Sequence, residues 1–487
     1  MLLLAWMTAS AGGLDLLEVG GAWGTPTTTD ATGLWWNPAG LGAGHGTRFT
    51  FEIAPTFATV DIDRTNPNYV HDPDAFGPAD YDYGGQAQYR TVAPVPFLGV
   101  VSDFGQPGLG LGFGLAVPHA KGVSGDPDQV THHHLIDGGN QALYLMVAGA
   151  YEIQDIVSIG LTGAYVSSSY HSDLLSETGT ALNEGLKENF DSQDTFYSDT
   201  MIEDTRYTSH VVSDTLTDSA LTFGAGIHVK ASDQVSLAAT YRHGFRVDHT
   251  GTATLDFDCP STDDIFGRAG AQIQGICDAD LTARMQVGYN LPSRIHGGIV
   301  VTPKPGIRLE GMGGYVFWNV FTDYDIKIDV DADSVPKDQP EQREETAALV
   351  SQEKQWARDN KNAFWFGVDG KFDVHEYVMI GGRVLYDKAA VPTQVLGPNN
   401  YDANTVAVTG LVVGKITKNF QVGLSGTQYI AQKREVTDSA WGITMYDNKK
   451  EVRYFYPSMN GTFASSITRI GISVRGQFDH GRSKPEI

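Results

Sequence analysis

The sequence predicts an all-β transmembrane protein: an antiparallel β-barrel of about fourteen strands, with an N-terminal hatch inside the lumen. Three observations lead to this fold class. Segments with period-two hydrophobicity recur along most of the chain. No run reaches the ~18 apolar residues that a membrane-spanning helix requires. The connections between the segments alternate between short and long. A chain that crosses a membrane without apolar helices has to do so as a closed barrel.

Composition agrees with one large β structure. The chain has 487 residues, among them 56 glycines, 21 tyrosines and 22 phenylalanines. Its 34 Lys and Arg residues stand against 58 Asp and Glu residues, which gives a net charge of −24. Nucleic acid is therefore not expected as a partner, because binding to phosphates requires a basic surface.

The N-terminal region divides into two parts. Residues 1–11 are apolar and end in Ala9-Ser10-Ala11, so we interpret them as the remnant of an export signal peptide, with an ordinary buried N-terminus as the alternative. In residues 12–46, Trp35 and Trp36 lead into Asn37-Pro38-Ala39. An Asn-Pro step fits neither the middle of a helix nor the middle of a sheet. A bulky apolar segment on irregular backbone needs a structure closed around it, so residues 12–46 are expected to form a hatch, or plug, in the lumen.

Residues 47–478 are expected to form the barrel, and a polar C-terminal tail follows at 479–487. Alternation also assigns the faces: Phe420, Val422 and Leu424 would face lipid, whereas Ser425 and Thr427 would face the lumen. The segments that carry the period-two pattern are 47–62, 91–103, 109–118, 141–153, 157–170, 218–230, 234–256, 282–302, 307–328, 362–373, 376–387, 403–416, 420–431 and 461–478.

The connections give the strongest indication of location. Alternating short and long connections are typical of an outer-membrane barrel, with short periplasmic turns, long extracellular loops and both ends in the periplasm. We therefore expect a multi-pass β-barrel in the outer membrane of a Gram-negative bacterium. The short connections are 104–108, 154–156, 231–233, 303–306, 374–375 and 417–419. The long connections are 63–90, 119–140, 171–217, 257–281, 329–361, 388–402 and 432–460. Aromatic residues near strand ends suit the two interfacial girdles, namely Tyr151, Tyr165, Tyr170, Phe245, Phe321, Tyr324, Tyr377, Tyr386 and Tyr429.

The third expected strand has an unusual inner face. Alternation places Gly110, Gly112 and Gly114 toward the lumen, while Leu111 and Phe113 face outward. A row of glycines weakens a strand and lets another backbone approach closely. The row would make room for the hatch, or it would mark a kink that opens the wall sideways to lipid. These two interpretations are compatible.

Several short motifs are spread in a defined order along nearly the whole chain. They are Gly20-Gly21-Ala22, Asn37-Pro38-Ala39, Tyr241-Arg242 with Val247, His249 and Gly251, Leu291-Pro292 with Trp318 and Phe321, Tyr386-Asp387 with Val391-Pro392 and Pro398, and residues 461–478. In these motifs the chain resembles the FadL family of outer-membrane channels for long-chain fatty acids and aromatic hydrocarbons.

The resemblance implies a passive channel for hydrophobic small molecules. Extracellular loops would capture the ligand, which would pass to a hatch-gated inner pocket and leave through a lateral opening at the kinked third strand. One departure is that the loops at 171–217 and 329–361 are long and acidic, whereas a family groove would be apolar. The alternative is a polar-solute pore, or a surface-display barrel whose loops bind partners.

Charged residues supply the candidates for ligand binding in the lumen. Alternation points Arg242, Arg246, Asp248, Arg308 and Glu310 inward. Arg242 and Arg246 are the residues that would hold a ligand carboxylate through a bidentate, charge-assisted bond. Buried charges more often pair with one another, so a structural network is the favoured alternative.

Other polar residues are expected to have structural roles. Three consecutive residues, His132, His133 and His134, cannot all point at one ion from an extended loop, so we expect an exposed loop and no metal site. Cys259 and Cys277 fall in one extracellular loop of an exported protein, which predicts a disulfide between them. No cofactor is expected. The expected partners are a hydrophobic ligand and outer-membrane lipid, and the protein is expected to be a monomer.

The sequence contains no nucleophile motif. It lacks Gly-x-Ser-x-Gly, His-Glu-x-x-His and a phosphate-binding loop. A lipid hydrolase would need a Ser–His pair assembled across strands, which spacing alone does not exclude. We therefore predict that the protein is not an enzyme.

Overall fold

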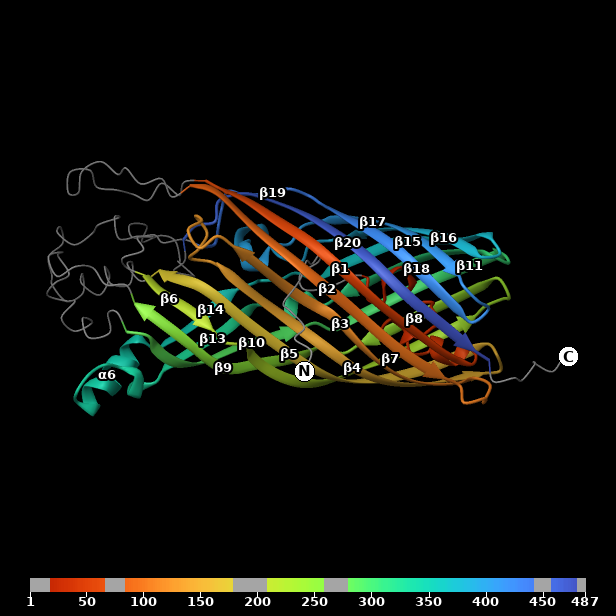
Figure 1. The fold of residues 1–487 in the computed structure, drawn as a ribbon, viewed down its shortest axis with the longest axis horizontal. Helices are drawn as coiled ribbons and strands as arrows, with labels where there is room; N and C mark the ends of the chain where they lie inside the picture. Colours follow the sequence, from red (N-terminus) through yellow and green to blue (C-terminus); the bar gives the residue numbers. More distant parts are fainter. Residues whose placement is uncertain (1–17, 66–83, 178–207, 258–278, 442–456, 480–487) are drawn as a thin grey trace.

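One closed antiparallel sheet forms the body of the protein (Figure 1). The computed structural model describes residues 18–65, 84–177, 208–257, 279–441 and 457–479. The strands are β1 (Thr47–Arg64), β2 (Gly85–Ser102), β3 (Leu109–Gly125), β4 (Asp137–Ile153), β5 (Val157–Glu177), β6 (Thr208–Ser213), β7 (Leu216–Lys230), β8 (Val235–Arg242), β9 (Phe245–Phe257), β10 (Leu281–Leu291), β11 (Arg294–Lys304), β12 (Ile307–Val316), β13 (Asp323–Val330), β14 (Gln352–Ala357), β15 (Ala363–His375), β16 (Val378–Asp387), β17 (Thr405–Lys415), β18 (Phe420–Ala431), β19 (Arg434–Val436) and β20 (Gly461–Phe478). The helical segments are η1 (Gly21–Trp23), α1 (Gly33–Trp36), α2 (Gly40–Ala43), η5 (Trp318–Val320), η6 (Ala332–Ser334), α6 (Pro340–Val350), η7 (Thr393–Val395) and η8 (Pro398–Asn400).

Hydrogen-bonded ladders lead around the whole wall. From β1 they pass through β2, β3, β4, β5, β7, β8, β11, β12, β15, β16, β17, β18 and β20. β20 then pairs with β1, so the wall closes on itself. The predicted closed antiparallel barrel is therefore confirmed. In the part of the chain that the structure describes, no helix is long and apolar enough to cross a membrane.

The expectation of about fourteen unbroken strands needs correction: the circuit of ladders crosses fourteen strands at the turn side, but the whole sheet is divided into twenty strand segments. Several stretches with one continuous period-two pattern are divided in the structure. β8 and β9 are separated by His243 and Gly244, and β10 and β11 by Pro292 and Ser293. Pro292 has no N–H group and cannot donate a ladder hydrogen bond. Hydrophobic periodicity runs on across such breaks, which is why the pattern did not reveal them.

The breaks coincide with a change in the outward-facing residues. β15 carries Phe364 and Phe366 on its exposed face, whereas β14, beyond the break at 358–362, carries Glu353 and Gln355. Gln355 is the register partner of Asp325 on β13. A lipid-facing wall has to be apolar, so the breaks mark the level at which the barrel leaves the hydrocarbon on the loop side.

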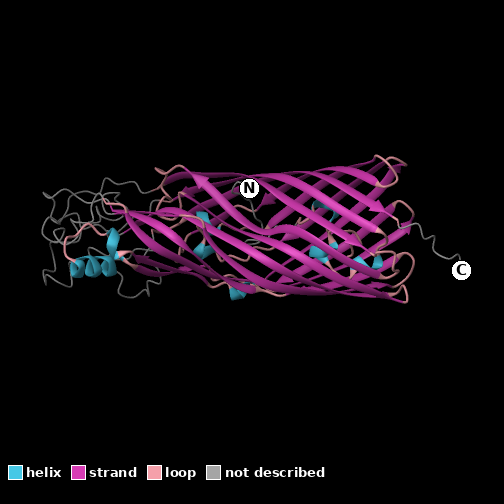
Figure 2. Cartoon of the chain, turned by 60° about the horizontal axis from the view of Figure 1, so that its bottom comes forward, coloured by secondary structure: helices cyan, strands magenta, loops and turns pink. Residues whose placement is uncertain are grey.

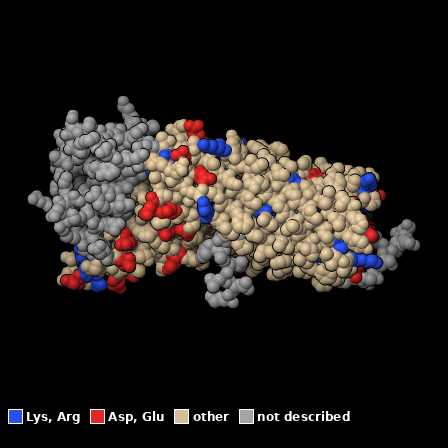
Figure 3. Space-filling view, turned by 45° about the horizontal axis from the view of Figure 1, so that its top comes forward, with Lys and Arg blue, Asp and Glu red and all other residues tan. Residues whose placement is uncertain are grey.

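The two ends of the barrel differ as the connection lengths predict. Short turns join β2 to β3, β4 to β5, β7 to β8, β11 to β12, β15 to β16 and β17 to β18. These turns lie at the end where the C-terminus emerges (Figure 2). Asp and Glu side chains crowd the opposite half of the barrel surface, next to the grey residues, and the turn-side half carries few charges in the same view (Figure 3). On the face shown, the turn-side half of the barrel is therefore largely apolar.

Alternation predicted the two faces of β18 correctly: Val422 and Leu424 are exposed and Thr427 is buried. The predicted aromatic girdles are correct only in part. Tyr151, Tyr165 and Tyr377 are exposed on the outer face, but Tyr170, Phe321, Tyr324 and Tyr429 are buried in the lumen. Side chains alternate between faces with a period of two, so the odd spacing between Tyr165 and Tyr170 puts the second ring on the inner face.

Candidate functional site

Residues 18–46, here called the N-terminal segment, lie inside the barrel. Their side chains and backbone bond to strands on every side of the lumen, from β1 and β5 to β12, β16 and β20. Ala22, Trp23, Leu34, Trp35 and Leu41 are all buried. A segment that reaches strands all around a closed wall has to lie within it.

Glu18 anchors the start of the described segment. Its carboxylate accepts hydrogen bonds from Thr409 Oγ1 (2.7 Å), Thr427 Oγ1 (2.7 Å) and Tyr429 OH (3.1 Å). Arg469 Nη1 lies 3.2 Å from Glu18 Oε2. The buried carboxylate therefore has an ionic partner and three hydroxyl donors, which is the kind of environment that a charge requires away from water.

Glu18 belongs to a balanced cluster of buried charges. Three acids and three bases connect the segment to the wall, namely Glu18, Glu52, Asp369, Arg469, Arg383 and Lys371. Arg383 also donates to the carbonyl oxygens of Gly21 (3.3 Å) and Ala22 (3.0 Å). The charges are mutually compensated only while the segment is in place.

Burial acts to raise the pKa of the Glu18 carboxyl, because it removes water from the charged form. Arg469 and Arg383 act in the opposite direction, as do the hydrogen bonds from Thr409 and Thr427. The net result holds the pKa of Glu18 below its ordinary value of 4.5. Glu18 is therefore ionised at neutral pH.

Arg242, one of the two predicted lumen arginines, contacts the N-terminal segment. Its Nη2 donates to the carbonyl oxygens of Trp35 (2.7 Å) and Leu34 (3.3 Å). Its guanidinium lies 4.2 Å from the centroid of the Trp35 ring. Cation–π contact and hydrogen bonds to helix-end carbonyls together fix α1 against β8. In this structure Arg242 therefore binds the N-terminal segment, and the predicted contact with a ligand carboxylate stays a prediction.

Arg246, the second predicted lumen arginine, lies on the outer face instead. It pairs with Asp248 (2.8 Å) and with Asp325 (2.8 Å). The break at His243 and Gly244 shifts the alternation by one residue, so Arg242 points inward and Arg246 outward. The placement of Arg246 and Asp248 in the lumen was therefore wrong. Arg308 and Glu310 do face inward, where they contact Thr27.

The Asn37-Pro38-Ala39 stretch follows α1 and packs against β5 and β7. Asn37 Nδ2 donates to the carbonyl oxygens of Pro26 (3.1 Å) and Ile227 (3.0 Å), and Asn37 Oδ1 accepts from Ala39 N (3.1 Å). Ser158 Oγ donates to Ala39 O (2.6 Å). Each polar group of this irregular stretch thus finds a partner in the wall or in the segment.

Glycines in the wall make this close approach feasible. A Cβ atom on Gly160 would overlap the backbone of Pro38 and Ala39, and one on Gly226 would overlap the Asn37 amide. A Cβ atom on Gly110 would overlap the Leu41 backbone. The segment therefore lies directly on the bare backbone of β3, β5 and β7.

The row of Gly110, Gly112 and Gly114 gives the segment room, but the wall is intact there. Gly112 and Gly114 pair with β2 on one side, and all three glycines pair with β4 on the other. The Leu34 side chain lies within 3.1 Å of a Cβ built on Gly112. Of the two interpretations, the geometry supports room for the segment, and the expected opening does not fall on this row.

An interruption of the wall lies further along the same pair of strands. The β2–β3 ladder stops after the pair Arg90–Ser124 and resumes at the pair Phe97–Ala116. The unpaired stretches contain Pro94, Pro96 and Pro118, which cannot donate ladder hydrogen bonds. The β3–β4 register also shifts between Ala116 and His119. β3 therefore kinks at this point.

The interruption borders the N-terminal segment. The Trp35 ring packs edge-on against His119 (6.3 Å between ring centroids) and Tyr144 (5.4 Å). His119 belongs to the kinked part of β3, so movement of α1 would change the lumen side of the interruption. This juxtaposition of Trp35, the kink and the unpaired part of the wall was not visible in the sequence, because it depends on register.

The lumen on the loop side contains an aromatic cluster that sequence reasoning missed. Tyr289 stacks on Phe321 (5.1 Å) and meets Tyr324 edge-on (5.0 Å), and Arg358 lies 4.4 Å from the Tyr324 ring centroid. A small cavity of about 30 Å³ lies beside Tyr324 and Arg358. Parity along β10 and β13 would have placed Tyr289 and Tyr324 inside, had the breaks been recognised.

The histidine triplet is not exposed as a whole. His133 and His134 are buried, and their ring nitrogens lie 3.3 Å from Leu175 O and 2.7 Å from Pro457 O. The expectation of an exposed loop was therefore wrong for these two residues, because the β3–β4 connection folds over the lumen. Within the described residues no group of three potential metal ligands occurs.

Cys259 and Cys277 lie outside the described residues, as does the expected signal remnant at 1–11.

A family model matches most of the chain. Residues 3–395 match the model described as "Outer membrane protein transport protein (OMPP1/FadL/TodX)". The chain belongs to the FadL/TodX family. Members of this family are transport channels and not enzymes, and they lie in the outer membrane as β-barrels. The predicted family, location and absence of enzymatic function are therefore confirmed.

Solved structures of FadL/TodX proteins share the fold at low sequence identity. A Pseudomonas aeruginosa FadL homologue aligns with a TM-score of 0.72 at 14% identity, covering 96% of this chain and 100% of that chain. The P. putida toluene transporter TodX aligns with a TM-score of 0.63 at 14% identity, covering 96% and 99%. The Ralstonia pickettii toluene transporter TbuX aligns with a TM-score of 0.57 at 15% identity, covering 96% and 98%. No curated protein shows significant sequence similarity to the chain.

Proposed function

We propose that this FadL/TodX protein is a passive channel for hydrophobic small molecules, such as long-chain fatty acids or aromatic hydrocarbons, and that the N-terminal segment is its hatch. The observation that carries the proposal is the burial of Trp35, Trp36 and Asn37 between the glycine-lined wall and the kink in β3. Structural relatives include toluene transporters, which supports an apolar cargo. The loops at 171–217 and 329–361 are acidic, whereas a family groove would be apolar, so a fatty acid and an aromatic hydrocarbon are both tested as ligands.

In this proposal the ligand enters from the loop side and leaves sideways. Extracellular loops capture the ligand, which moves down the aromatic part of the lumen until it meets the hatch. A shift of α1 then frees the space beside His119, where the β2–β3 ladder is interrupted. The lateral exit is proposed at this interruption, between 91–96 and 117–123, and Gly110, Gly112 and Gly114 provide the bed on which the hatch slides.

Restoring backbone donors at the interruption tests the exit. Replacing Pro96 and Pro118 by valine supplies two N–H groups and removes two fixed backbone angles, so the strands can pair and narrow the gap. We expect uptake of both a labelled long-chain fatty acid and toluene to fall by about tenfold or more, as a barrier increase of about 1.4 kcal/mol would produce. Uptake is measured in a Gram-negative host that lacks its own channel for these compounds.

Pro303→Val near the turn-side end of β11 is the matched control, because it changes a wall proline that lies outside the interrupted β2–β3 ladder. The control is expected to transport like wild type. Equal uptake by the double variant and wild type would exclude this exit, whereas no uptake by wild-type protein for either compound would contradict the channel function itself. Steady ion conductance in a planar bilayer would instead favour a polar-solute pore.

A further inference from the structure

The wall has a second incomplete place, on different strands from the kink in β3. β16 ends at Asp387 and β17 begins at Thr405, while the flanking strands continue toward the loops as β14 and β19. β14 pairs with β13, and β19 pairs with β20. Among the described residues no ladder joins β14 to β19. The connection 388–404 folds into this space and buries Val391, Val395 and Leu396 against the lumen.

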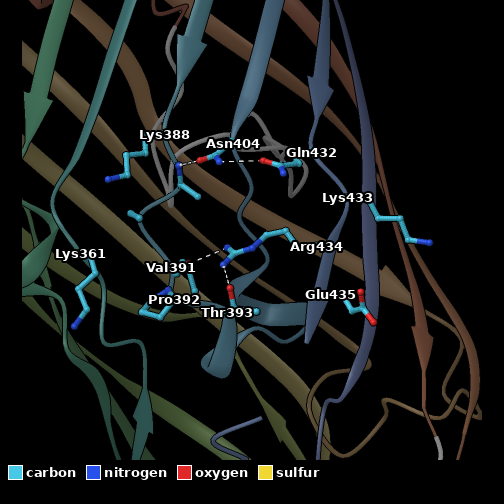
Figure 4. Close-up of a pocket in the computed structure, with 12 residues that line it drawn as sticks. Lys361, Lys388, Val391, Pro392, Thr393, Asn404, Gln432, Lys433, Arg434 and Glu435 are labelled. Carbon is cyan, nitrogen blue, oxygen red and sulfur yellow. Dashed lines mark hydrogen bonds between the residues drawn. The ribbon is translucent and has the colours of Figure 1, made fainter. Parts of the chain in front are cut away.

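A hollow of about 470 Å³ lies where this connection meets the wall (Figure 4). We call it the lysine hollow. It is lined by side chains from the ends of β16, β17 and β18, from the connection and from the break before β15, including Lys361, Lys388, Lys433, Arg434, Asn404 and Gln432. Its volume falls within the range of about 300–1,000 Å³ that is usual for small-molecule sites.

The charge of the lysine hollow is opposite to that of the chain. Four cationic side chains line it against one acid, Glu435, in a protein whose net charge is −24. Glu435 points away from Arg434 in Figure 4. Within the described part of the chain, Lys361, Lys388 and Lys433 form no ion pair. Such unpaired cations are unusual on a surface where Arg246 and Lys327, for example, are paired.

Arg434 has a different role from the lysines. Its guanidinium donates to Val391 O (2.8 Å), Asp402 O (2.8 Å) and Thr393 Oγ1 (2.6 Å). Asp402 in turn accepts from the backbone N–H of Ala390 (2.6 Å). These bonds fix the floor of the hollow to β19. Figure 4 shows the Lys433 side chain pointing away from those of Lys361 and Lys388, so the rim presents two separate cationic sites around a preformed floor.

The position of the lysine hollow relative to the aromatic residues of the outer wall indicates which kind of anion it faces. Lys388 continues the outward-facing series of Val384 and Tyr386, and its Nζ lies 5.5 Å from the Phe364 ring centroid. Phe364, Phe366 and Tyr386 form a cluster on the outer wall with centroid separations of 5.3 to 6.4 Å. Aromatic clusters of this kind lie at the membrane–water interface. The lysines therefore stand at the level of the outer-leaflet headgroups.

We propose that the lysine hollow binds the phosphate-bearing headgroup of an outer-leaflet lipid. Its phosphates would be held by Lys361, Lys388 and Lys433 through charge-assisted hydrogen bonds. Its acyl chains would run along the exposed faces of Phe364, Phe366 and Val384, which continue directly into the lipid band. A soluble phosphate would use the charges alone. The bound lipid would cover the part of the wall that no ladder closes.

Native mass spectrometry of the purified full-length protein tests the proposal. Wild-type protein from a Gram-negative host is compared with the triple variant Lys361→Gln, Lys388→Gln, Lys433→Gln. Each cation near an anionic headgroup contributes about 1 kcal/mol, so the triple variant should lose about 100-fold in affinity for phosphorylated lipid A. The matched control is Lys304→Gln, Lys327→Gln, Lys337→Gln, which removes three lysines elsewhere and should bind like wild type.

Two further samples distinguish the source of the phosphate, and heat-modified gel migration verifies that every variant is folded. Lipid A without its phosphates should bind wild type no better than it binds the triple variant, and inorganic phosphate at millimolar concentration should not displace the lipid. The proposal is overturned if the triple variant retains phosphorylated lipid at the wild-type level. It is equally overturned if dephosphorylated lipid binds as well as lipid A, or if inorganic phosphate displaces it.

Discussion

Replacing Gly160 by valine is expected to expel the N-terminal segment from the barrel while the wall stays folded. A side chain at this position of β5 would overlap the backbone of Pro38 and Ala39, which cannot turn aside as a flexible side chain can. Hydrogen exchange of the purified protein in lipid nanodiscs measures the effect. Amides of residues 33–42 should lose their protection, whereas the amides of β5 and β7 should keep theirs.

Gly163→Val on the same strand is the matched control. The nearest atom to a Cβ on Gly163 is a Val147 side-chain carbon at 4.0 Å, an ordinary van der Waals contact, so the added Cβ overlaps nothing. This variant should exchange like wild type. If Gly160→Val leaves residues 33–42 fully protected, the segment does not lie on β5 in solution, and the hatch proposal loses its structural basis.

The second large effect is expected from Glu18→Ala. Removing Glu18 leaves three buried bases against two acids and takes the acceptor from Thr409, Thr427 and Tyr429. Breaking a buried ion pair in this way costs about 3–5 kcal/mol. Docking of the start of the segment should weaken by that amount. Exchange of the amides at 20–30 should therefore accelerate by about 100-fold or more, since 1.4 kcal/mol corresponds to a factor of ten.

The pH dependence of docking follows from the direction of the Glu18 shift. The pKa of Glu18 is lowered in the docked state, so its contribution is fully present above the ordinary value of 4.5 and is lost as pH falls through the docked value. Exchange in wild type should therefore show no Glu18-dependent change between pH 6 and pH 8. Asp233→Ala, in the exposed β7–β8 turn, is the control for loss of an acid. Equal exchange in Glu18→Ala and Asp233→Ala would contradict the role of the charge cluster.

Local pattern was sufficient to predict a closed barrel, its lipid-facing side and its two ends. Alternating Phe420, Val422 and Leu424 identified the lipid face of β18, and alternating short and long connections identified the two ends of the barrel. Both signals repeat in every hairpin, so a single irregularity does not remove them. The family resemblance at Asn37-Pro38-Ala39 likewise depends on contiguous residues, and the family match agrees with it.

Features that depend on register or on breaks were not predictable in the same way. The shift at His243 and Gly244 reversed the expected side of Arg246, although Arg242 before the break was assigned correctly. The interruption beside Pro118 requires knowledge of which residues of β2 and β3 face each other. The burial of His134 depends on the fold of a long connection, for which hydrophobic periodicity gives no information.

Tethering the hatch to the wall tests directly whether it has to move. A Cβ built on Gly298 of β11 lies 3.4 Å from Pro26 Cβ, close to the separation of about 3.8 Å in disulfides, and the other atoms nearest to it belong to the side chains of Thr27 and Glu310, so Pro26→Cys with Gly298→Cys should crosslink. Proteoliposomes that contain the oxidised double variant are predicted to take up a labelled apolar compound no faster than protein-free vesicles, and reduction should restore the wild-type rate. The single variants Pro26→Cys and Gly298→Cys control for the substitutions. Uptake at the wild-type rate by fully crosslinked protein would contradict a moving hatch.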